Sequence, residues 1–295
     1  MTQDTTTQLA MLLQNNYGLS NCLVEKPEDG IEGNTYIITA GKQKYVAKVY
    51  GNQQQADILA NYQNALYEAN VPVSAIVKTQ ANELATKLNG QYAVLCEFAH
   101  GSPLGWRKEL SNMPNPLSRS IALALAKMHY VGQSIHAAKL GYALSAPAVL
   151  SPHNLKACRQ TLIHGDLTRE NIFVDPHTSA LTAIIDFGDA HYDYITYDIA
   201  IALTHIYVTK SWGIDFSGIE DFLAAYTRHT SLTQHERQTI LPFMIFRNTV
   251  LLREIDLQLT KDRDDHKDLE SIKQSLQTKL LLLKEHSSQM KNIFD

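Results

Sequence analysis

The apolar pattern of the chain changes at one point, and this change limits the folds that the chain can adopt. Before residue 99 the pattern is rich in short strand-like segments, and after residue 105 helical periodicity dominates. The connector between them, "AHGSPLG", is rich in Gly and Pro and is the best candidate boundary in the chain. We therefore expect an α+β chain with two lobes: residues 1–98 form a small β-rich lobe, 99–105 a hinge, and 106–295 a larger, mostly helical lobe.

The first lobe should contain a hairpin followed by a helix. Residues 34–39 and 44–50 are rich in β-branched and aromatic side chains, and the short turn "AGKQ" lies between them. Residues 53–69 then place apolar side chains three and four positions apart, which predicts a helix that ends near Pro72. A further helix is expected at 5–16, and further strands at 74–79 and 92–98.

The second lobe should consist of helices around one short hairpin. "IFV" and "LTAII" read as strands, and the turn-forming segment "DPHTSA" links them. The predicted helices cover residues 118–132, 197–209, 219–229, 239–259 and 268–290. A cleft between two such lobes is a common ligand site.

Charge and cysteine content exclude several classes of function. A net charge of −4 disfavours nucleic acid as the main partner, because phosphate binding needs a basic face. Three scattered cysteines without a CxxC pair indicate neither a disulfide framework nor a cysteine zinc site, and they fit a reducing cytoplasm. The first residues do not resemble a signal peptide, and no apolar stretch approaches the roughly 18–20 residues of a membrane helix. The 12 histidines form no HExxH pattern, which disfavours a metal hydrolase.

The polar segment "TLIHGDLTRENIFVD", residues 161–175, precedes and enters the predicted hairpin. Asn171 leads into the first strand and Asp186 leaves the second, so an antiparallel pair should bring them to the same end. Two such oxygen ligands suit Mg²⁺, with phosphates and water completing its shell. Asp166 lies five residues before Asn171, where a short loop can point its carboxylate toward a substrate hydroxyl.

This order of residues matches the arrangement that phosphoryl transfer requires. In kinases a loop aspartate orients the attacking hydroxyl, while an asparagine and a later DFG aspartate hold the metal. Here the pattern is His164-Gly165-Asp166-x4-Asn171, followed by "IIDFG". The alternative is a polar loop and turn that use Asp and Asn for local hydrogen bonds. The joint occurrence of both motifs at hairpin spacing favours catalysis.

The segment "HGDLTRENIFVD…AIIDFGDAHYDYITYDIA" resembles the aminoglycoside phosphotransferase/choline kinase-like family, which has a protein-kinase-like fold. It is most similar to the members that act on hydroxylysine or homoserine, and the resemblance covers about residues 30 to 205. The resemblance implies that Asp166 is the catalytic base and that Asn171 and Asp186 bind Mg²⁺. It also implies that His164 and Asp198 support the catalytic loop.

The same resemblance implies an ATP site in the first lobe. Lys48, in "YVAKVY", matches the strand lysine that contacts the α- and β-phosphates. The backbone of Gly33 and Asn34, in "GNTY", would meet phosphate oxygens. The backbone of Glu97 and Ala99 would pair with adenine at the hinge.

One position departs from the family pattern. The helix after Lys48 usually provides a glutamate that pairs with the lysine, and here alignment places Ala60 or Asn61 at that position. Asp57 lies one turn earlier on the same face and could substitute, whereas Glu68 is expected to face solvent. An unusual partner for the lysine, or weak nucleotide binding, would follow.

We therefore expect a cytoplasmic small-molecule kinase that uses ATP and Mg²⁺ to phosphorylate a hydroxyl. One alternative is a catalytically silent nucleotide-binding relative. A second is a protein kinase, which is disfavoured because only about ten residues separate Asp186 from Asp198, too few for an activation segment. The oligomeric state is left open.

The acceptor is poorly determined by the sequence. Asp189 and Asp193 follow the metal segment and could meet an ammonium group, while Arg247 and Arg253 could reach a carboxylate. The alternative is that all four are solvated or paired on the surface, as most charged residues are. These four residues stay tentative candidates for substrate contact.

Overall fold

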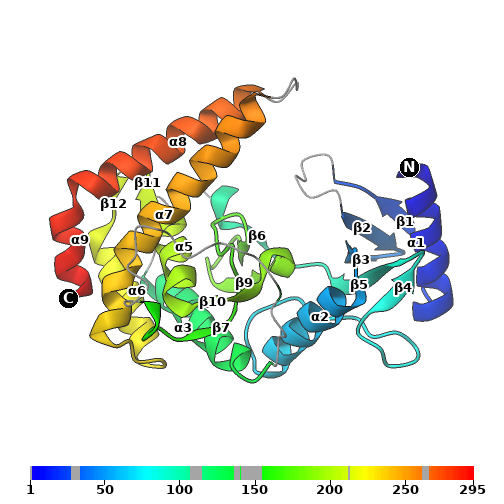
Figure 1. The fold of residues 1–295 in the computed structure, drawn as a ribbon. Helices are drawn as coiled ribbons and strands as arrows, with labels where there is room; N and C mark the ends of the chain where they lie inside the picture. Colours follow the sequence, from blue (N-terminus) through cyan, green and yellow to red (C-terminus); the bar gives the residue numbers. More distant parts are fainter. Residues whose placement is uncertain are drawn as a thin grey trace.

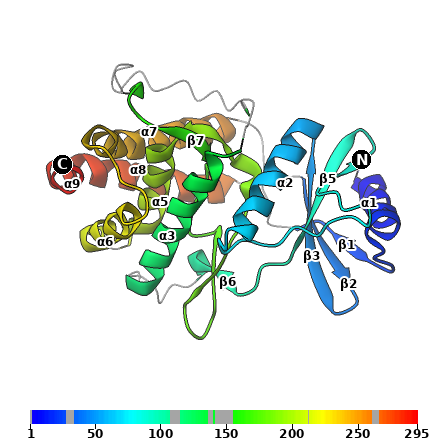
Figure 2. The ribbon, with the colours of Figure 1, turned by 90° about the horizontal axis from the view of Figure 1, so that it is seen from below.

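The computed structural model describes residues 2–27, 34–106, 115–135, 140, 155–211, 213–260 and 266–295. It has a β-rich N-terminal part and a helical C-terminal part, as the sequence predicts (Figure 1). Seen from below, helix α2 lies between the N-terminal sheet and the C-terminal helices (Figure 2). None of the described helices is long and apolar enough to cross a membrane.

One antiparallel sheet of five strands, in the order β1-β2-β3-β5-β4, forms the N-terminal part. Helix α1 packs on this sheet through a core that includes Leu9, Leu13, Ile38 and Leu95. The predicted hairpin is confirmed, with Ile37 opposite Val46. The elements are α1 (Thr2–Tyr17), β1 (Leu23–Glu25), β2 (Thr35–Ala40), β3 (Gln43–Tyr50), α2 (Gln53–Glu68), β4 (Thr86–Leu88) and β5 (Gln91–Glu97).

Helix α2 is flanked by two asparagines. The Asn52 side chain accepts a hydrogen bond from the Gln55 amide at 2.8 Å, and Asn70, directly after the C-cap residue Ala69, adopts a left-handed conformation with φ 54°. Both features fit the preferences for Asn at an N-cap and just beyond a helix C-terminus. The predicted helix at 53–69 is confirmed to within a residue.

The predicted strand at 74–79 is wrong. This stretch forms only an isolated bridge between Ile76 and Cys96, while Val73 just before it bridges to Ile184 of the C-terminal part. Val73 and Ile76 are buried because the chain passes between the two parts there, so their apolar character reflects burial rather than membership of a ladder.

In the part of the C-terminal region that the structure describes, helices surround three small sheets. The predicted helices are confirmed, except that the last one is divided at His286 into two. The strand at His191–Tyr194 was not predicted, because "HYDY" has little apolar alternation, and it pairs with the strand before the catalytic loop. The elements are β6 (Ser102–Pro103), α3 (Asn115–Gly132), β7 (Gln160–Ile163), β8 (Ile172–Val174), β9 (Leu181–Ile184), β10 (His191–Tyr194), α5 (Ile195–Tyr207), β11 (Val208–Thr209), β12 (Gly213–Ile214), α6 (Phe216–Thr227), α7 (Gln234–Leu259), α8 (His266–Glu285) and α9 (Ser287–Phe294).

The Gly/Pro-rich connector leads directly into the sheet that contains the predicted catalytic hairpin. β6 within this connector pairs with β8, and the sheet order is β6-β8-β9. The short apolar β8 and β9 are mostly buried, which fixes the ends of the hairpin relative to the N-terminal sheet. This arrangement positions the polar residues of the loop before β8 and of the segment after β9.

Candidate active site

The two predicted metal ligands lie at the same end of the β8–β9 hairpin, one position apart in register. Ile172 lies opposite Ile184, and the Ile185 amide donates to the Asn171 carbonyl at 3.0 Å, so Ile185 rather than Asp186 faces Asn171. Asp186 leaves the strand with a left-handed backbone, φ 67° and ψ 71°. This conformation interrupts the strand alternation. The Asp186 carboxylate then contacts the Lys48 ammonium of β3.

Asp166 lies in the loop between β7 and β8 and is held by two neighbours. The Asn171 Nδ2 donates to both the backbone carbonyl and the Oδ2 of Asp166, each at 2.9 Å. Nη2 of Arg247, from α7, donates to Oδ1 at 2.9 Å. Burial raises the pKa of the Asp166 carboxyl, although the Arg247 charge opposes the rise.

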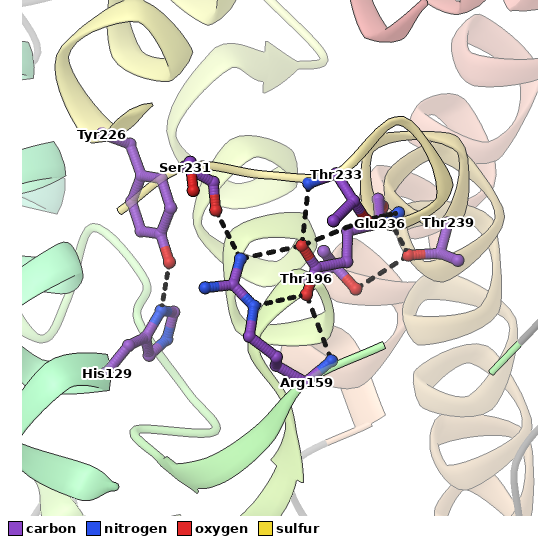
Figure 3. Close-up of polar contacts among 8 residues, drawn as sticks. All are labelled: His129, Arg159, Thr196, Tyr226, Ser231, Thr233, Glu236 and Thr239. Carbon is purple, nitrogen blue, oxygen red and sulfur yellow. Dashed lines mark hydrogen bonds and ion pairs between the residues drawn. The ribbon is translucent and has the colours of Figure 1, made fainter. Parts of the chain in front are cut away.

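The backbone before Asp166 is held by Asp198 at the start of α5. Asp198 is fully buried and accepts hydrogen bonds from the amides of His164 (2.9 Å) and Gly165 (3.0 Å) and from His129 Nε2 (3.1 Å). The Tyr226 hydroxyl in turn lies 2.7 Å from His129 Nδ1 (Figure 3). Burial acts to raise the pKa of Asp198, but the hydrogen bonds and charge from His129 and His164 outweigh it and lower the pKa.

His164 is placed as a structural residue. Its Nδ1 accepts the Asp166 amide at 3.2 Å, so its Nε2 carries the proton and donates to the Ile185 carbonyl at 2.9 Å. Both ring nitrogens are therefore occupied by hydrogen bonds. His164 thus ties the catalytic loop to the residue before Asp186, which agrees with its expected supporting role and leaves it no free nitrogen for a metal.

Gly165 adopts a backbone conformation that leaves no room for a side chain. It has φ +81°, and a Cβ there would approach the Asp189 carbonyl to 2.4 Å, so Gly165→Ala should strain or displace the catalytic loop. We expect a lower melting temperature and a kcat reduced by at least about 10-fold, because an ångström-scale misplacement of reacting groups costs up to about 100-fold in rate. Gly90→Ala is the matched control, since Gly90 has φ +83° but open space around it. Equal effects in both variants would contradict the steric argument.

Two cavities meet at Lys48. One of about 210 Å³ is mostly apolar, and the other, of about 470 Å³, has a more polar lining. Lys48 and Thr35 line both cavities. The apolar cavity is lined by Ile37, Val46, Gln63, Cys96, Phe98, Phe173, Ile185 and Asp186, and by the hinge residues Glu97 and Ala99. The polar cavity is lined by Asn34, Tyr50, Asn52, Gln55, Gly188, Asp189 and His191, among others. Gly33 lies outside the described residues.

The carboxylate that the structure places against Lys48 is that of Asp186, which does not belong to the helix after Lys48. Asp57 does not line either cavity, and Asn61 uses its side chain to donate to the Asp57 carbonyl at 2.7 Å. Gln63 instead lines the apolar cavity with Lys48 and donates to the Ser74 carbonyl at 2.8 Å. Gln63 is thus the residue of α2 that lines the apolar cavity beside Lys48, and it lies two or three positions after Ala60 and Asn61.

The tentative substrate residues lie in different environments. Asp189 lines the polar cavity. Asp193 is satisfied locally, because it lies 3.3 Å from His191 Nε2 and accepts the Tyr194 amide at 2.7 Å. Arg253 is exposed on α7, whereas Arg247 is largely buried and contacts Asp166. Of the four, Asp189 and Arg247 lie at the site.

Helix α7, which places Arg247, is fixed at its beginning by contacts that the sequence does not reveal. Arg159, directly before β7, pairs with the buried Glu236 through Nε (2.7 Å) and Nη2 (2.8 Å), as Figure 3 shows. Glu236 also completes a capping box with Thr233 at the helix N-terminus. Strand β7 leads into the catalytic loop, so this pair links the loop and α7. The two residues are 77 positions apart, and no local pattern predicts their contact.

Among the described residues, no group of three or more His, Cys, Asp and Glu side chains could hold a metal ion. The candidate metal site is therefore the pair Asn171 and Asp186. Because the Asn171 Nδ2 is used by Asp166, its amide oxygen is the atom left for another partner. One amide oxygen and one carboxylate form a hard donor set that fits Mg²⁺ with phosphate and water ligands.

Comparison with known proteins finds a family profile and related sequences, and all of them are named as phosphotransferases or kinases. The profile of the phosphotransferase enzyme family matches residues 136–238. A homoserine kinase of Methylobacillus flagellatus is 26% identical over 234 residues, covering 70% of each chain. A mouse hydroxylysine kinase is 33% identical over 89 residues, which are 28% of this chain and 23% of the mouse protein.

Solved structures share the fold across nearly the whole chain. An amicoumacin kinase complexed with AMP-PNP and Ca²⁺ has a TM-score of 0.67 at 15% identity, covering 97% of this chain and 96% of that chain. A microcompartment-associated aminopropanol kinase has a TM-score of 0.68 at 17% identity, covering 96% and 98%. A spectinomycin phosphotransferase has a TM-score of 0.63 at 15% identity, covering 95% and 93%. At these identities the likeness establishes the fold.

Proposed function

Because the chain carries a domain of the phosphotransferase enzyme family and has homoserine and hydroxylysine kinases as homologues, we propose that it transfers the γ-phosphoryl group of ATP to the hydroxyl of a small hydroxylated amine, amino acid or aminoglycoside, with Mg²⁺. The single observation that carries the proposal is that Asp166, which contacts Asn171, is acted on by the charge of Asp186, and that Asp186 contacts Lys48, which lines both cavities. These are the parts that phosphoryl transfer uses: a base, two metal ligands and a phosphate-binding cation.

The nucleotide site is proposed from the contrast between the two cavities. The apolar cavity is lined by Ile37, Val46, Phe98 and Phe173, which suits a flat, largely apolar base, and the hinge residues Glu97 and Ala99 offer backbone groups beside it. The polar cavity suits phosphates, and Lys48 lines both. Lys48 would neutralise phosphate charge where the base and phosphate portions of ATP join.

The metal site is proposed at Asn171 and Asp186. Mg²⁺ bound there would screen the charge of the β- and γ-phosphates. The Lys48 ammonium lowers the pKa of Asp186, which otherwise burial would raise, so Asp186 stays ionised at neutral pH and is ready to hold a cation. Asp186 leaves the strand with a left-handed backbone, and its carboxylate contacts Lys48 beside the apolar cavity.

Asp166 is proposed to orient and deprotonate the acceptor hydroxyl. Its carboxylate is 28% exposed, and Asn171 and Arg247 hold both of its oxygens, so its position is defined before an acceptor binds. Burial raises its pKa, which makes the carboxylate a better proton acceptor than an exposed aspartate. The Asp198 hydrogen bonds hold the loop that carries it.

The proposal is tested by incubating the protein with ATP, Mg²⁺ and a panel of hydroxylated amines, amino acids, sugars and aminoglycosides, and by detecting phosphorylated products. Turnover of at least one acceptor is expected. Tight ATP binding without turnover of any acceptor would instead support the catalytically silent alternative. The protein-kinase alternative is disfavoured by the segment after Asp186, where η2 (Phe187–Asp189) and β10 lead directly to α5 at Ile195.

Asp186→Ala tests the metal site. The variant should lose Mg²⁺-dependent ATP binding, because it removes the one carboxylate of the donor pair, and titration calorimetry with and without Mg²⁺ measures this loss. Asp57→Ala is the matched control: Asp57 lines neither cavity, so ATP affinity should stay within about twofold of wild type. Wild-type, Mg²⁺-dependent affinity in Asp186→Ala would remove Asp186 from the metal site.

A further inference from the structure

The His191 ring, which lines the polar cavity, has an acceptor at each of its nitrogens. Its Nδ1 lies 2.6 Å from the Asp189 carbonyl oxygen, and its Nε2 lies 3.3 Å from Oδ2 of Asp193. A carbonyl oxygen has no proton to give, so Nδ1 carries one. The other Asp193 oxygen accepts the Tyr194 amide at 2.7 Å, which favours the ionised carboxylate. Both ring nitrogens can donate at once only when the ring is a positively charged imidazolium.

The surroundings of the ring favour this charge. The His191 side chain is only 6% exposed, and burial acts to lower its pKa. The hydrogen bonds to Asp193 and to the Asp189 carbonyl, together with the charges of Asp193 and Asp198, outweigh burial and raise the pKa. The other titratable side chains that line the polar cavity are Lys48, Tyr50 and Asp189.

The ring also lies between the two segments that carry the proposed catalytic groups. Asp189 ends η2, three residues after the metal ligand Asp186, so the Nδ1 contact holds the segment that follows this ligand. Gly165 packs against both partners of the same contact. A Cβ on Gly165 would lie 2.4 Å from the Asp189 carbonyl oxygen and 3.0 Å from Nδ1 and Cε1 of His191. Asp166, the proposed base, directly follows Gly165 in the chain.

We propose that His191 is a positioning residue for phosphoryl transfer, and that its positive charge holds the segment after Asp186 against the catalytic loop that carries Asp166. This inference rests on the proposed phosphotransferase function and adds a positioning residue to it. Both N–H groups of the ring are used by Asp189 and Asp193, so the ring acts by positioning rather than by donating to a phosphate. Loss of one ring proton leaves either the Asp189 carbonyl or the Asp193 carboxylate without its donor. Turnover should therefore fall as the pH rises through the titration of His191.

The pH dependence of kcat tests this role. For wild type, kcat on an accepted hydroxyl compound should fall on an alkaline limb whose midpoint lies above the ordinary histidine pKa of about 6.5. Asp193→Asn removes the carboxylate that raises the His191 pKa, so the midpoint should move to lower pH. His191→Gln should lack the limb and have a kcat about 10-fold below the wild-type plateau, because ångström-scale misplacement costs up to about 100-fold. His177→Gln, at an exposed position of the β8–β9 turn, should keep the wild-type profile.

Lys279 of α8 also titrates in the alkaline range, because burial lowers its pKa to about 8. The charged side chains that act on Lys279 are Glu170 and Arg169, so replacing Asp193 should leave its titration unchanged. A limb with an unmoved midpoint in Asp193→Asn would therefore belong to a group other than His191 and would overturn the inference.

Nuclear magnetic resonance tests the inference without turnover. Long-range proton–nitrogen spectra should show both His191 ring nitrogens protonated below a midpoint that lies above about 6.5, the ordinary histidine value. The backbone amide resonance of Gly165 should shift with the same midpoint, and this shift should vanish in His191→Gln. A ring with one unprotonated nitrogen at pH 6.5 and below would overturn the imidazolium. A Gly165 amide that does not follow the titration would overturn the coupling to the catalytic loop.

Titration with ATP and Mg²⁺ separates positioning from phosphate binding. In His191→Gln the dissociation constant should change less than about threefold, because the ring has no N–H left for a phosphate. A loss of affinity as large as the loss of kcat would make His191 a phosphate-binding residue and overturn the inference. Turnover of no acceptor by wild type would contradict the proposed function, whereas the Gly165 resonance would still decide the inference.

Discussion

Asp166→Asn is expected to lower kcat by about 10²- to 10⁴-fold, the usual contribution of a positioned general base, while ATP affinity changes less than about threefold. Asparagine keeps the size of the side chain and can still accept the Asn171 hydrogen bond, but it cannot take a proton from the acceptor. Asp166 lines neither cavity, so the nucleotide loses no contact there. Initial-rate kinetics on the accepted hydroxyl compound and ATP titration measure the two quantities.

The matched control for this variant is Asp256→Asn. Asp256 is 51% exposed on α7 and pairs with Lys273 of α8, far from the loop in sequence, so turnover should stay near wild type. If Asp166→Asn retained wild-type turnover, the assignment of the base would be wrong. If it lost ATP binding as well as turnover, the catalytic loop would be contributing to the nucleotide site.

Asp198→Asn is expected to reduce the free energy of unfolding by about 3–5 kcal/mol, the usual cost of removing one charge from a buried pair. Asp198 is fully buried and accepts three hydrogen bonds, two of them from the amides of His164 and Gly165. An amide side chain has one acceptor oxygen, so it leaves buried donors unsatisfied and releases the loop that carries Asp166. Chemical denaturation measures the stability change, and kcat should fall with it.

The pH dependence of the folding stability provides a second test of the role of Asp198. The folded pKa of Asp198 lies below the unfolded value of about 3.9, so its carboxylate stabilises the folded state at neutral pH. That contribution is present above the unfolded pKa and is lost as the pH falls through the folded pKa. Asp198→Asn should therefore destabilise the protein strongly at pH 7 and less near pH 3.

Tyr226→Phe is the graded control for Asp198. It removes only the hydroxyl that contacts His129 Nδ1, so the expected loss is about 1 kcal/mol. A stability loss in Asp198→Asn no larger than that in Tyr226→Phe would contradict the bracing role of the carboxylate.

The proximity of Asp166 and Asn171, and of Asn171 and the end of the hairpin, was predictable from the sequence because it depends on local order. A loop of fixed length separates Asp166 from Asn171, and a short hairpin must return the chain near that loop before Asp186. Turn-forming residues and short apolar strands specify such a hairpin without reference to the rest of the fold. The helices were predictable for the same reason, since periodicity reports which face is buried.

Local sequence patterns gave wrong or incomplete predictions where the packing of distant segments decides the structure. The apolar residues of the stretch 74–79 lie where the chain passes between the two parts of the molecule, and the sequence alone cannot distinguish this from a strand. The left-handed conformation in which Asp186 leaves β9 was not predicted either. The position of Gln63 beside the lysine cavity depends on how α2 is rotated against the sheet.

The sequence by itself determined the reaction class, through the spacing of His164, Asp166, Asn171 and Asp186 along one short stretch. Only the tertiary structure decided what surrounds that stretch. Arg247 meets Asp166 across 81 positions, and Arg159 meets Glu236 across 77, because the packing of α7 against α5 brings these side chains together. Contacts between distant segments arise from the burial of many apolar side chains at once, and no short motif encodes them.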